Sequence, residues 1–215
     1  MSMEKSINIS LVDFLRIKFS PLARSAVSIL KVPSWVLQNR PHPSPPHLKR
    51  RRIIALANKH KFESFVETGT YRGDMLARIS KKSSISKIMS IELDNRLAEE
   101  AQFRFHRDTK ITILQGDSGS VLSKITSGLP RPALFWLDGH YSGGVTALGK
   151  TTTPIFAELQ AIDSSKRDSD VLLIDDIRLF NGLDGYPTLE ELTDFIHKLN
   201  PKWNCVVLGD FLQIS

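Results

Sequence analysis

The segment SFVETGTYRG, residues 64–73, carries the clearest signal of the fold. Its first five residues form a short, apolar, β-rich run, which predicts a buried strand. The glycines Gly69 and Gly73 then allow a tight turn, and a helix is expected from Gly73 to about Lys81. A strand that leads through a glycine turn into a helix is the unit from which parallel α/β sheets are built.

The same unit recurs along the chain. Further apolar, β-rich runs occur at residues 87–92, 111–115, 133–138 and 170–175. Stretches with helical spacing of apolar residues alternate with them, at 94–106, 118–126, 154–163 and 188–199, and another, at about 48–60, precedes the first strand. Continuous apolar strands between helices are typical of a sheet covered on both faces. The sequence therefore predicts an α/β fold with a doubly wound, mainly parallel sheet.

The C-terminal end departs from this alternation. Two β-rich runs, residues 204–208 and 211–215, are joined by only Gly209 and Asp210. Parallel strands need a long crossover connection, whereas a two-residue connection suits an antiparallel hairpin. We therefore expect a C-terminal antiparallel hairpin on the same sheet.

The composition indicates one globular domain. The chain has 215 residues, of which 41% are hydrophobic and 24% charged, and this is too short for two catalytic domains. Its single cysteine, Cys205, excludes an internal disulfide and a cysteine-rich zinc site. Charged residues interrupt the most apolar part of the N-terminus, so we expect neither a membrane span nor a cleaved signal peptide. These features favour a cytoplasmic protein.

The basic residues are concentrated near the N-terminus. Residues 1–52 contain 10 Lys or Arg against 2 Asp or Glu, a net charge of +8, although the whole chain carries only +6. Apolar spacing over residues 9–31 and four prolines within residues 41–47 predict a basic, amphipathic helical arm with a proline-rich linker over residues 1–46. The domain proper then covers residues 47–215. The arm could touch a membrane, contribute to a homodimer or remain solvated, and its charge alone does not separate these options.

Two acidic residues frame the predicted glycine turn. In an open α/β sheet, ligands bind beyond the carboxyl ends of the strands. Glu92 ends the second strand and is placed to accept hydrogen bonds from both hydroxyls of a ribose. Glu67 lies directly before the turn, where a carboxylate would repel the pyrophosphate of a dinucleotide but would tolerate an ammonium or a sulfonium group. The turn therefore favours S-adenosylmethionine over NAD.

Three short motifs carry a family resemblance. E-x-G-x-Y-x-G at residues 67–73, IELD at 91–94 and GDS at 116–118 resemble motifs one to three of class I methyltransferases, and Tyr71 stands where many relatives have glycine. The resemblance covers residues 62–215 and implies a Rossmann-like sheet of strand order 3-2-1-4-5-7-6. Asp117 and Ser118 would cover the adenine edge. The expected cofactor-binding residues are Glu67, Gly69, Tyr71, Gly73, Glu92, Asp117, Ser118 and Asp138.

Three aspartates follow the fourth and fifth predicted strands. Asp138 ends one strand, and Asp175 and Asp176 end the next. In the strand order that the resemblance implies, these two ends are neighbours. Three crowded carboxylates repel one another, and a cation with a preference for oxygen ligands, such as Mg²⁺, is the simplest compensation. The arrangement resembles the metal ligands of catechol-type and macrocin-type O-methyltransferases, and it predicts a divalent metal site.

His140 is the expected catalytic base. It lies two residues after Asp138, where the macrocin-type pattern D-G-D has its second aspartate. An ordinary histidine pKa of about 6.5 suits proton removal near neutral pH. Because histidine replaces aspartate here, its role as a base or as a ligand stays open. The expected catalytic residues are His140 and Asp138.

These features predict a metal-assisted transfer of a methyl group from S-adenosylmethionine to a hydroxyl of a small molecule, for instance a sugar or another polyol. A nicotinamide-dependent oxidoreductase is disfavoured because the G-x-G-x-x-G pattern is missing. A non-catalytic scaffold with the same fold remains an alternative. Nucleic acid is not an expected partner, since no aromatic-rich basic face accompanies the arm.

Overall fold

One seven-stranded sheet organises the molecule. The computed structural model describes residues 11–39, 42–138 and 153–215. The strand order is β3-β2-β1-β4-β5-β7-β6, and the pairs β5–β7 and β7–β6 are antiparallel while the other pairs are parallel. The strands are β1 (Ser64–Thr68), β2 (Lys87–Glu92), β3 (Ile111–Gln115), β4 (Ala133–Leu137), β5 (Val171–Ile174), β6 (Cys205–Leu208) and β7 (Phe211–Ile214). The predicted doubly wound, Rossmann-like sheet with its C-terminal hairpin is confirmed.

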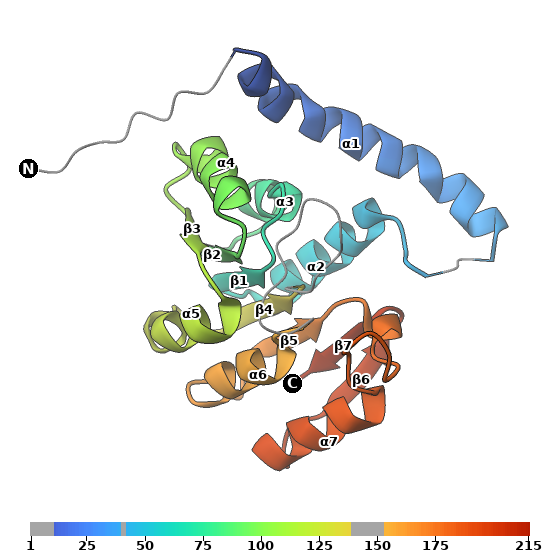
Figure 1. Ribbon diagram of the computed structural model, residues 1–215, viewed down its shortest axis with the longest axis vertical. Coiled ribbons are helices and arrows are strands. Elements are labelled where there is room, and N and C mark those ends of the chain that lie inside the picture. The colour runs from blue at the N-terminus through green and yellow to red at the C-terminus, as the bar shows by residue number, and fades with distance from the viewer. Residues whose placement is uncertain (1–10, 40–41, 139–152) are drawn as a thin grey trace, which may run out of the picture.

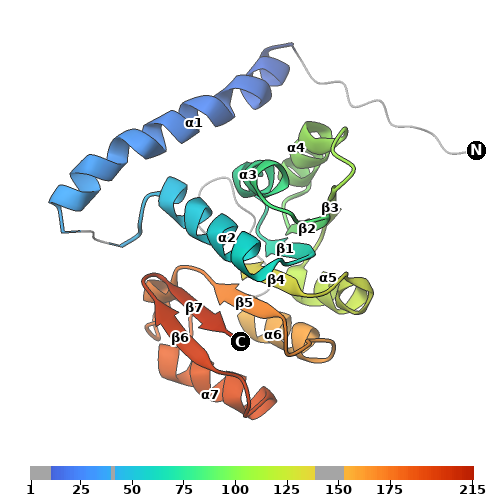
Figure 2. The same ribbon diagram turned by 180° about the vertical axis from the view of Figure 1, so that it is seen from behind.

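Helices cover both faces of this sheet, so that the sheet is the middle layer of three (Figures 1 and 2). One face carries α2 (Pro46–His60), α3 (Asp74–Lys82) and α4 (Asn95–Phe105), and the other carries α5 (Ser118–Ile125), α6 (Ile155–Asp163) and α7 (Leu189–Leu199). Short 3₁₀ turns lie at Thr126–Gly128 and Ile177–Leu179. Every residue of the central strands β1 and β4 is buried, because helices cover them on both sides.

Alternate residues of β4 belong to the two separate halves of the core. Phe135 packs in the cluster beneath α5, α6 and α7, and Trp136 in the cluster beneath α2, α3 and α4. This follows from the two-residue repeat of a strand, whose successive side chains point to opposite faces. The register of β1 with β4 places Glu67 beside Trp136, so Glu67 belongs to the edge of the second cluster.

The N-terminal helix α1 (Leu11–Leu37) is one continuous helix within the segment predicted as a helical arm. In both ribbon views it runs along the outside of the molecule, near α3 and α4 and towards α2 (Figures 1 and 2). Exposed apolar side chains on it include Leu30 and Leu37. Among the described helices, none is long and apolar enough to cross a membrane.

The proline-rich linker is shorter in the structure than the sequence predicted, because α2 begins at Pro46, inside the predicted linker. Pro46 occupies the first turn of α2. Proline is well suited to that position, since the first amides of a helix have no partner within the helix and the ring fixes a helical φ. The N-terminal end of α2 therefore lies over the carboxyl ends of the parallel strands, where the candidate site is found.

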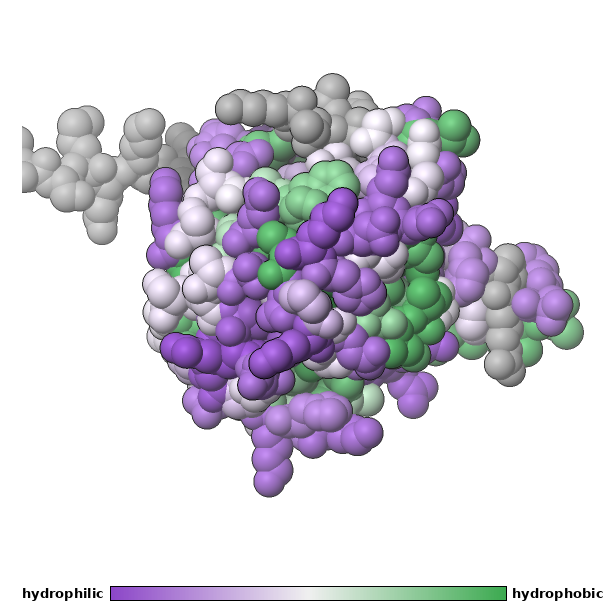
Figure 3. Space-filling view, turned by 90° about the horizontal axis from the view of Figure 1, so that it is seen from below, coloured by the Kyte–Doolittle hydropathy of each residue, from purple (hydrophilic) through white to green (hydrophobic). Residues whose placement is uncertain are grey.

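The surface is mostly hydrophilic in the view of Figure 3, with a few hydrophobic patches between charged groups. The edge strand β6 has exposed apolar side chains, at Val206, Val207 and Leu208. The site lies elsewhere, at the carboxyl ends of the parallel strands.

Candidate active site

A cavity of about 870 Å³ opens at the carboxyl ends of β1 and β4. Its volume lies in the range expected of a site for a cofactor or another small molecule. The lining comes from α1, the residues before α2, the N-terminal part of α2, the turn after β1 and the ends of β4 and β5. This is the sheet edge at which ligands bind in open α/β folds.

The turn between β1 and α3 forms one wall of the cavity and adopts the tight geometry that the sequence predicted. Three of its residues have left-handed φ angles, 82° at Gly69, 47° at Tyr71 and 68° at Gly73. A Cβ atom on Gly73 would lie 2.5 Å from Cε2 of Phe105. Gly73 is therefore required both for its backbone conformation and for the close approach of α4.

Glu92 fastens this turn to the end of β2. Its carboxylate accepts hydrogen bonds from the backbone amides of Tyr71, at 2.7 Å, and Asp94, at 3.0 Å. The side chain is buried beside the turn and is not among the residues that line the cavity in the described part of the chain. Its predicted contact with a ribose stays a prediction.

Glu67 lines the cavity from a buried position at the end of β1. Burial raises the pKa of its carboxyl group well above the ordinary range; a hydrogen bond from Ser90 Oγ at 2.8 Å opposes this shift, and the nearby Asp138 and Glu92 add to it. A protonated Glu67 would not repel a pyrophosphate, so the charge argument against a dinucleotide loses force. A ligand cation beside Glu67 would favour its ionised form again.

Asp117 and Ser118, the two residues expected at the adenine edge, make hydrogen bonds within the fold in this structure. Asp117 caps α5 by accepting a hydrogen bond from the amide of Ser120 at 3.0 Å. The hydroxyl of Ser118 is buried and donates to Glu158 Oε1 at 2.5 Å. Neither residue is part of the described cavity lining, and their contact with a cofactor stays a prediction.

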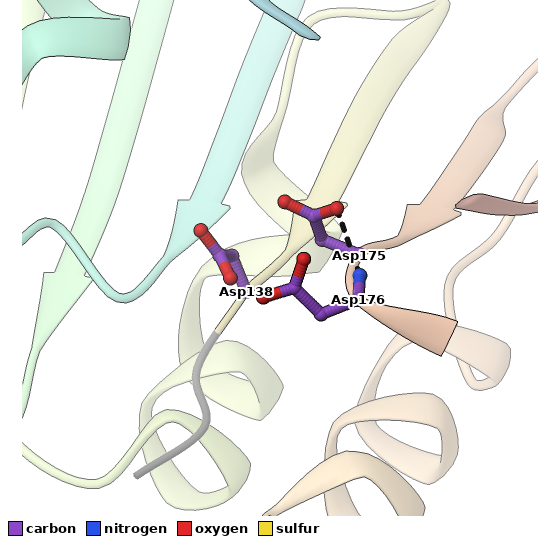
Figure 4. A group of neighbouring side chains, drawn as sticks. All are labelled: Asp138, Asp175 and Asp176. Carbon is purple, nitrogen blue, oxygen red and sulfur yellow. Dashed lines mark hydrogen bonds between the residues drawn. The ribbon is translucent and has the colours of Figure 1, made fainter. Parts of the chain in front are cut away.

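Asp138, Asp175 and Asp176 do converge. One oxygen from each carboxylate lies within 4.8 Å of the others. Figure 4 shows the three side chains facing a common space, with Asp176 donating its backbone amide to Asp175 Oδ1 at 2.8 Å. The parallel pairing of β4 with β5 explains the contact, since it brings the ends of the two strands side by side.

A lysine and an arginine complete this group. Lys49 Nζ on α2 donates to Asp175 Oδ1 at 2.7 Å and to Asp176 Oδ1 at 2.5 Å. Arg178 Nη1 donates to Asp176 Oδ1 at 2.6 Å and also to the buried Asp210, which lies at the hairpin turn between β6 and β7. The cluster therefore contains four carboxylates and two cations among the described residues.

These contacts set the charges of the cluster. Burial raises the pKa of Asp175 to about 8, with the Asp138 carboxylate adding to the shift and Lys49 opposing it. Burial would also raise the pKa of Asp176, but the bonds from Arg178 and Lys49 outweigh it and hold that pKa below the ordinary range. Burial lowers the pKa of Lys49, yet the two aspartates outweigh this and raise it overall. Lys49 is therefore an ammonium ion.

The donor set fits a divalent cation in its chemistry, because three carboxylates that converge within 4.8 Å offer only oxygen atoms. The same carboxylates also fit the Lys49 ammonium group, because one oxygen of Asp175 and one oxygen of Asp176 accept its hydrogen bonds. The predicted metal therefore stays a prediction, and the Lys49 ammonium group lies where it would bind. The predicted base His140 lies outside the described residues.

Trp136 supplies a further polar group at the cavity. Its indole is 3% exposed and packs edge-on against Phe211, with the ring centroids 5.4 Å apart. Its Nε1–H is buried and has no hydrogen-bond partner in the described part of the chain. A buried donor beside a cavity costs free energy unless a ligand or water accepts its hydrogen bond, so this group suits a bound molecule.

Sequence reasoning missed Lys49 and Asp210. Lys49 is one of the many basic residues of the N-terminal region, and one signal distinguishes it: Lys49, Ile53 and Ala57 are four residues apart and share one helical face. Ile53 and Ala57 are fully buried, which places Lys49 on the inward face of α2. Asp210 was read only as part of a hairpin turn.

No protein-family model matches the sequence, and no curated protein sequence matches it. Solved structures do match, at low identity. The SAH-bound methyltransferase PaMTH1 of Podospora anserina is 13% identical, with 100% of this chain and 97% of that chain covered and a TM-score of 0.61. The O-methyltransferase of Bacillus cereus in complex with SAH is 13% identical over 94% and 96% of the two chains, with a TM-score of 0.62.

The O-methyltransferase TomG of Streptomyces achromogenes, in complex with SAM, is also 13% identical, with 94% of this chain and 93% of that chain covered and a TM-score of 0.55. These likenesses extend over nearly the whole sheet and the helices that cover it. The chain therefore has the fold of the class I S-adenosylmethionine-dependent methyltransferases.

Proposed function

We propose that the protein is an S-adenosylmethionine-dependent O-methyltransferase that acts on a hydroxyl group of a small molecule. The observation that carries the proposal is the cavity in which the glycine turn after β1 and the aspartates after β4 and β5 share one space. A methyl donor and an acceptor must meet at one place, and this cavity joins both groups of residues. SAH or SAM is bound in three fold neighbours, two of which are O-methyltransferases by name, and this supports the proposal.

The donor half of the site is the turn from Gly69 to Gly73. The turn has no bulky side chain at its two glycines, so a ligand can approach the backbone closely. Glu67 at its start would face the positively charged methionine part of the donor, and Glu92 behind it would orient the ribose. Burial of Glu67 strengthens any interaction with a ligand cation, because few water molecules screen it.

The acceptor half of the site is the acidic cluster. In the proposed reaction, an acceptor oxygen attacks the methyl carbon of the sulfonium. A carbon–oxygen bond forms while the carbon–sulfur bond breaks, the sulfur keeps the electron pair, and the hydroxyl proton leaves to a base. The role of the protein is to hold donor and acceptor in line and to exclude water. His140 remains the proposed base.

Asp138, Asp175 and Asp176 are the residues that would hold a divalent cation such as Mg²⁺. When bound, such a cation would orient neighbouring acceptor oxygens and lower the pKa of the attacking hydroxyl.

The acceptor that we propose is a hydroxylated small molecule, for instance a sugar, and the proposed compartment is the cytoplasm. The half-buried, unpaired Cys205 is compatible with a reducing environment.

The test is a mass-spectrometric screen. Candidate sugars, polyols and aromatic diols are incubated with the protein and S-adenosylmethionine, and the products are examined for a gain of one methyl group. We expect a methylated product with the wild type and its loss with Asp175→Ala. Asp168→Ala, at an exposed position, is the matched control and should keep full activity. Equal activity of Asp175→Ala and wild type would remove the acidic cluster from the reaction.

The same samples distinguish the two rival functions. An oxidoreductase would gain thermal stability from NAD and not from S-adenosylmethionine. A scaffold protein would bind neither or would bind the donor without any methylated product. A ligand that binds the folded state at a hundred times its Kd stabilises the fold by about 2.7 kcal/mol, which a thermal shift assay detects readily.

A further inference from the structure

Lys49 is held inside the acidic cluster and not on the surface of α2. Its side chain is 12% exposed, and the Nζ atom lies 2.7 Å from Asp175 Oδ1, 2.5 Å from Asp176 Oδ1 and 3.8 Å from Asp210 Oδ2. The Phe211 ring lies against the same ammonium group, with its centroid 5.7 Å from Nζ. The group is therefore surrounded by carboxylates and one aromatic face, as a bound cation would be.

The position of Lys49 is fixed by the helix that carries it. Ile53 and Ala57, one and two turns further along α2, are buried in the core beneath α2, α3 and α4. The backbone amides of Leu48 and Lys49 donate hydrogen bonds to the carbonyl oxygen of Pro45, and these bonds fix the first turn of α2. The helix thus delivers the ammonium group to the cluster from a packed scaffold. This contrasts with a flexible surface lysine, for which an ion pair contributes little.

Charge explains why the cluster needs this group. Asp176 shares its Oδ1 atom between Lys49 and Arg178, and Asp210 takes a hydrogen bond from Arg178, whereas Arg178 has no contact with Asp175 in the described structure. Lys49 is thus the cation that faces Asp175, which is 5% exposed. Buried carboxylates without a cation are strongly unfavourable, so removal of Lys49 would leave a vacancy that attracts another cation.

We propose that Lys49 is the resident cation of the acidic cluster, and that Lys49 and a divalent metal ion exclude each other between Asp175 and Asp176. The chain itself then supplies the cation between Asp175 and Asp176 without added metal. One consequence concerns catalysis: methyl transfer should proceed in the presence of a chelator. This consequence alone rests on the proposed function. The occupancy of the cluster by Lys49 can be tested without any measurement of activity.

The first experiment is a Mn²⁺ titration followed by electron paramagnetic resonance. We compare wild type with Lys49→Met, which keeps the length of the side chain and removes its charge, and with Lys59→Met at an exposed position of the same helix. Lys49→Met should bind one Mn²⁺ per chain at least about tenfold more tightly than wild type, because a cluster of carboxylates that has lost one of its two cations attracts a hard cation. Lys59→Met should behave as wild type.

A double variant, Lys49→Met with Asp176→Asn, assigns the new site and should lose the gained Mn²⁺. Equal Mn²⁺ affinity in wild type and Lys49→Met overturns the proposal, whether both proteins bind the ion or neither does. Binding gained equally by Lys59→Met overturns it too, since a general loss of positive charge would then explain the effect.

The second experiment needs only the wild type and decides the matter if Lys49→Met does not fold. The protein is treated with an amine-acylating reagent, and the modified lysines are identified by peptide mass spectrometry. Lys49 should be modified at least about tenfold more slowly than Lys59, and 10 mM Mg²⁺ should leave its rate unchanged. Rapid modification of Lys49, or acceleration by Mg²⁺, would show that the lysine does not hold the site.

Binding of SAH is measured on the same samples. A wild type that protects Lys49 but fails to bind SAH contradicts the proposed function and leaves the lysine proposal standing. If the wild type binds SAH but Mg²⁺ readily displaces Lys49, the lysine proposal is contradicted and the proposed function is left standing.

Discussion

Gly73 shows how one missing side chain shapes the donor half of the site. Its φ of 68° and the approach of the Phe105 ring leave no room for a Cβ atom. We expect Gly73→Ala to destabilise the protein by about 2 to 4 kcal/mol, since a left-handed alanine costs roughly 1 kcal/mol and overpacking of the core costs more. Urea unfolding measures this. Gly128→Ala is the control, because a Cβ atom there would contact nothing within 4 Å; equal losses in the two variants would disprove the steric argument.

Glu158 makes the stability of the protein depend on pH. Burial raises its pKa from an ordinary value of 4.5 to about 7, although a hydrogen bond from Ser118 opposes the shift. The folded state therefore prefers the protonated group. The stabilising contribution is complete below about pH 4.5 and is lost as the pH rises through 7.

Glu158→Gln removes this titration. We expect the variant to be more stable than wild type at pH 8 by up to about 3 kcal/mol, because 2.5 pKa units correspond to about that free energy. The advantage should disappear at about pH 4. Thermal or urea unfolding at the two pH values measures the difference, with Glu99→Gln at an exposed position as control. A variant less stable than wild type at pH 8 would contradict the burial of a protonated carboxyl group.

At the scale of single residues, the sequence predicted the carboxylates better than their partners. Asp138, Asp175 and Asp176 end predicted strands, and the order of a parallel sheet decides that such ends meet. Lys49 arrives from a helix more than 120 residues earlier in the chain, as its separation of 126 from Asp175 shows. No local pattern encodes a contact of that range. Periodicity identified the inward face of α2 but not what the lysine would meet there.

The capping box at the start of α7 is the clearest local signal among the elements. Thr188 Oγ1 accepts a hydrogen bond from the amide of Glu191, whose carboxylate in turn accepts one from the amide of Thr188. We expect Thr188→Ala to cost about 1 kcal/mol of stability, since the amide at the helix start loses its acceptor. Urea unfolding is again the measurement. Thr193→Ala, inside the same helix, should cost less, and a larger loss there would contradict the capping role.

Elements were predictable where periodicity and turn chemistry agree. The strand–turn–helix unit at residues 64–73 gave the correct start of the sheet, because its apolar run and its glycines specify the same structure. Helix boundaries were less certain. The prolines before α2 indicated an extended segment, yet one of them starts the helix, and proline is compatible with either structure at that position.

At the scale of the whole molecule, α1 and the segment after it form an outer wall of the cavity. Lining residues from α1 include Arg24, Lys31 and Trp35, and Arg24 makes two hydrogen bonds of 2.8 Å to Asp74 on α3. Among the side chains that the structure describes, which in α1 begin at residue 23, the two core clusters contain no residue of this helix. We therefore propose that residues 47–215 are the catalytic domain and that residues 1–46 complete its ligand site as an arm.

Removal of residues 1–38 tests this division. The truncated protein should remain folded, because its core is untouched, but its affinity for SAH should fall by roughly tenfold, since the ligand loses one wall of its site. Calorimetry measures the affinity and circular dichroism the fold. Arg24→Gln is a milder variant that removes the ion pair with Asp74 and leaves the rest of α1 in place, so it should weaken binding less. Unchanged SAH affinity in the truncated protein would exclude the arm from the site.

The most decisive measurement is a crystal structure of the protein with SAH, because it shows where the donor half of the site lies. We predict SAH in the cavity at the ends of β1 and β4, with its ribose at Glu92, its amino-acid part at Glu67 and Gly69, and its sulfur facing Asp138. SAH bound elsewhere on the molecule, or a nicotinamide dinucleotide occupying this cavity in its place, would contradict the account.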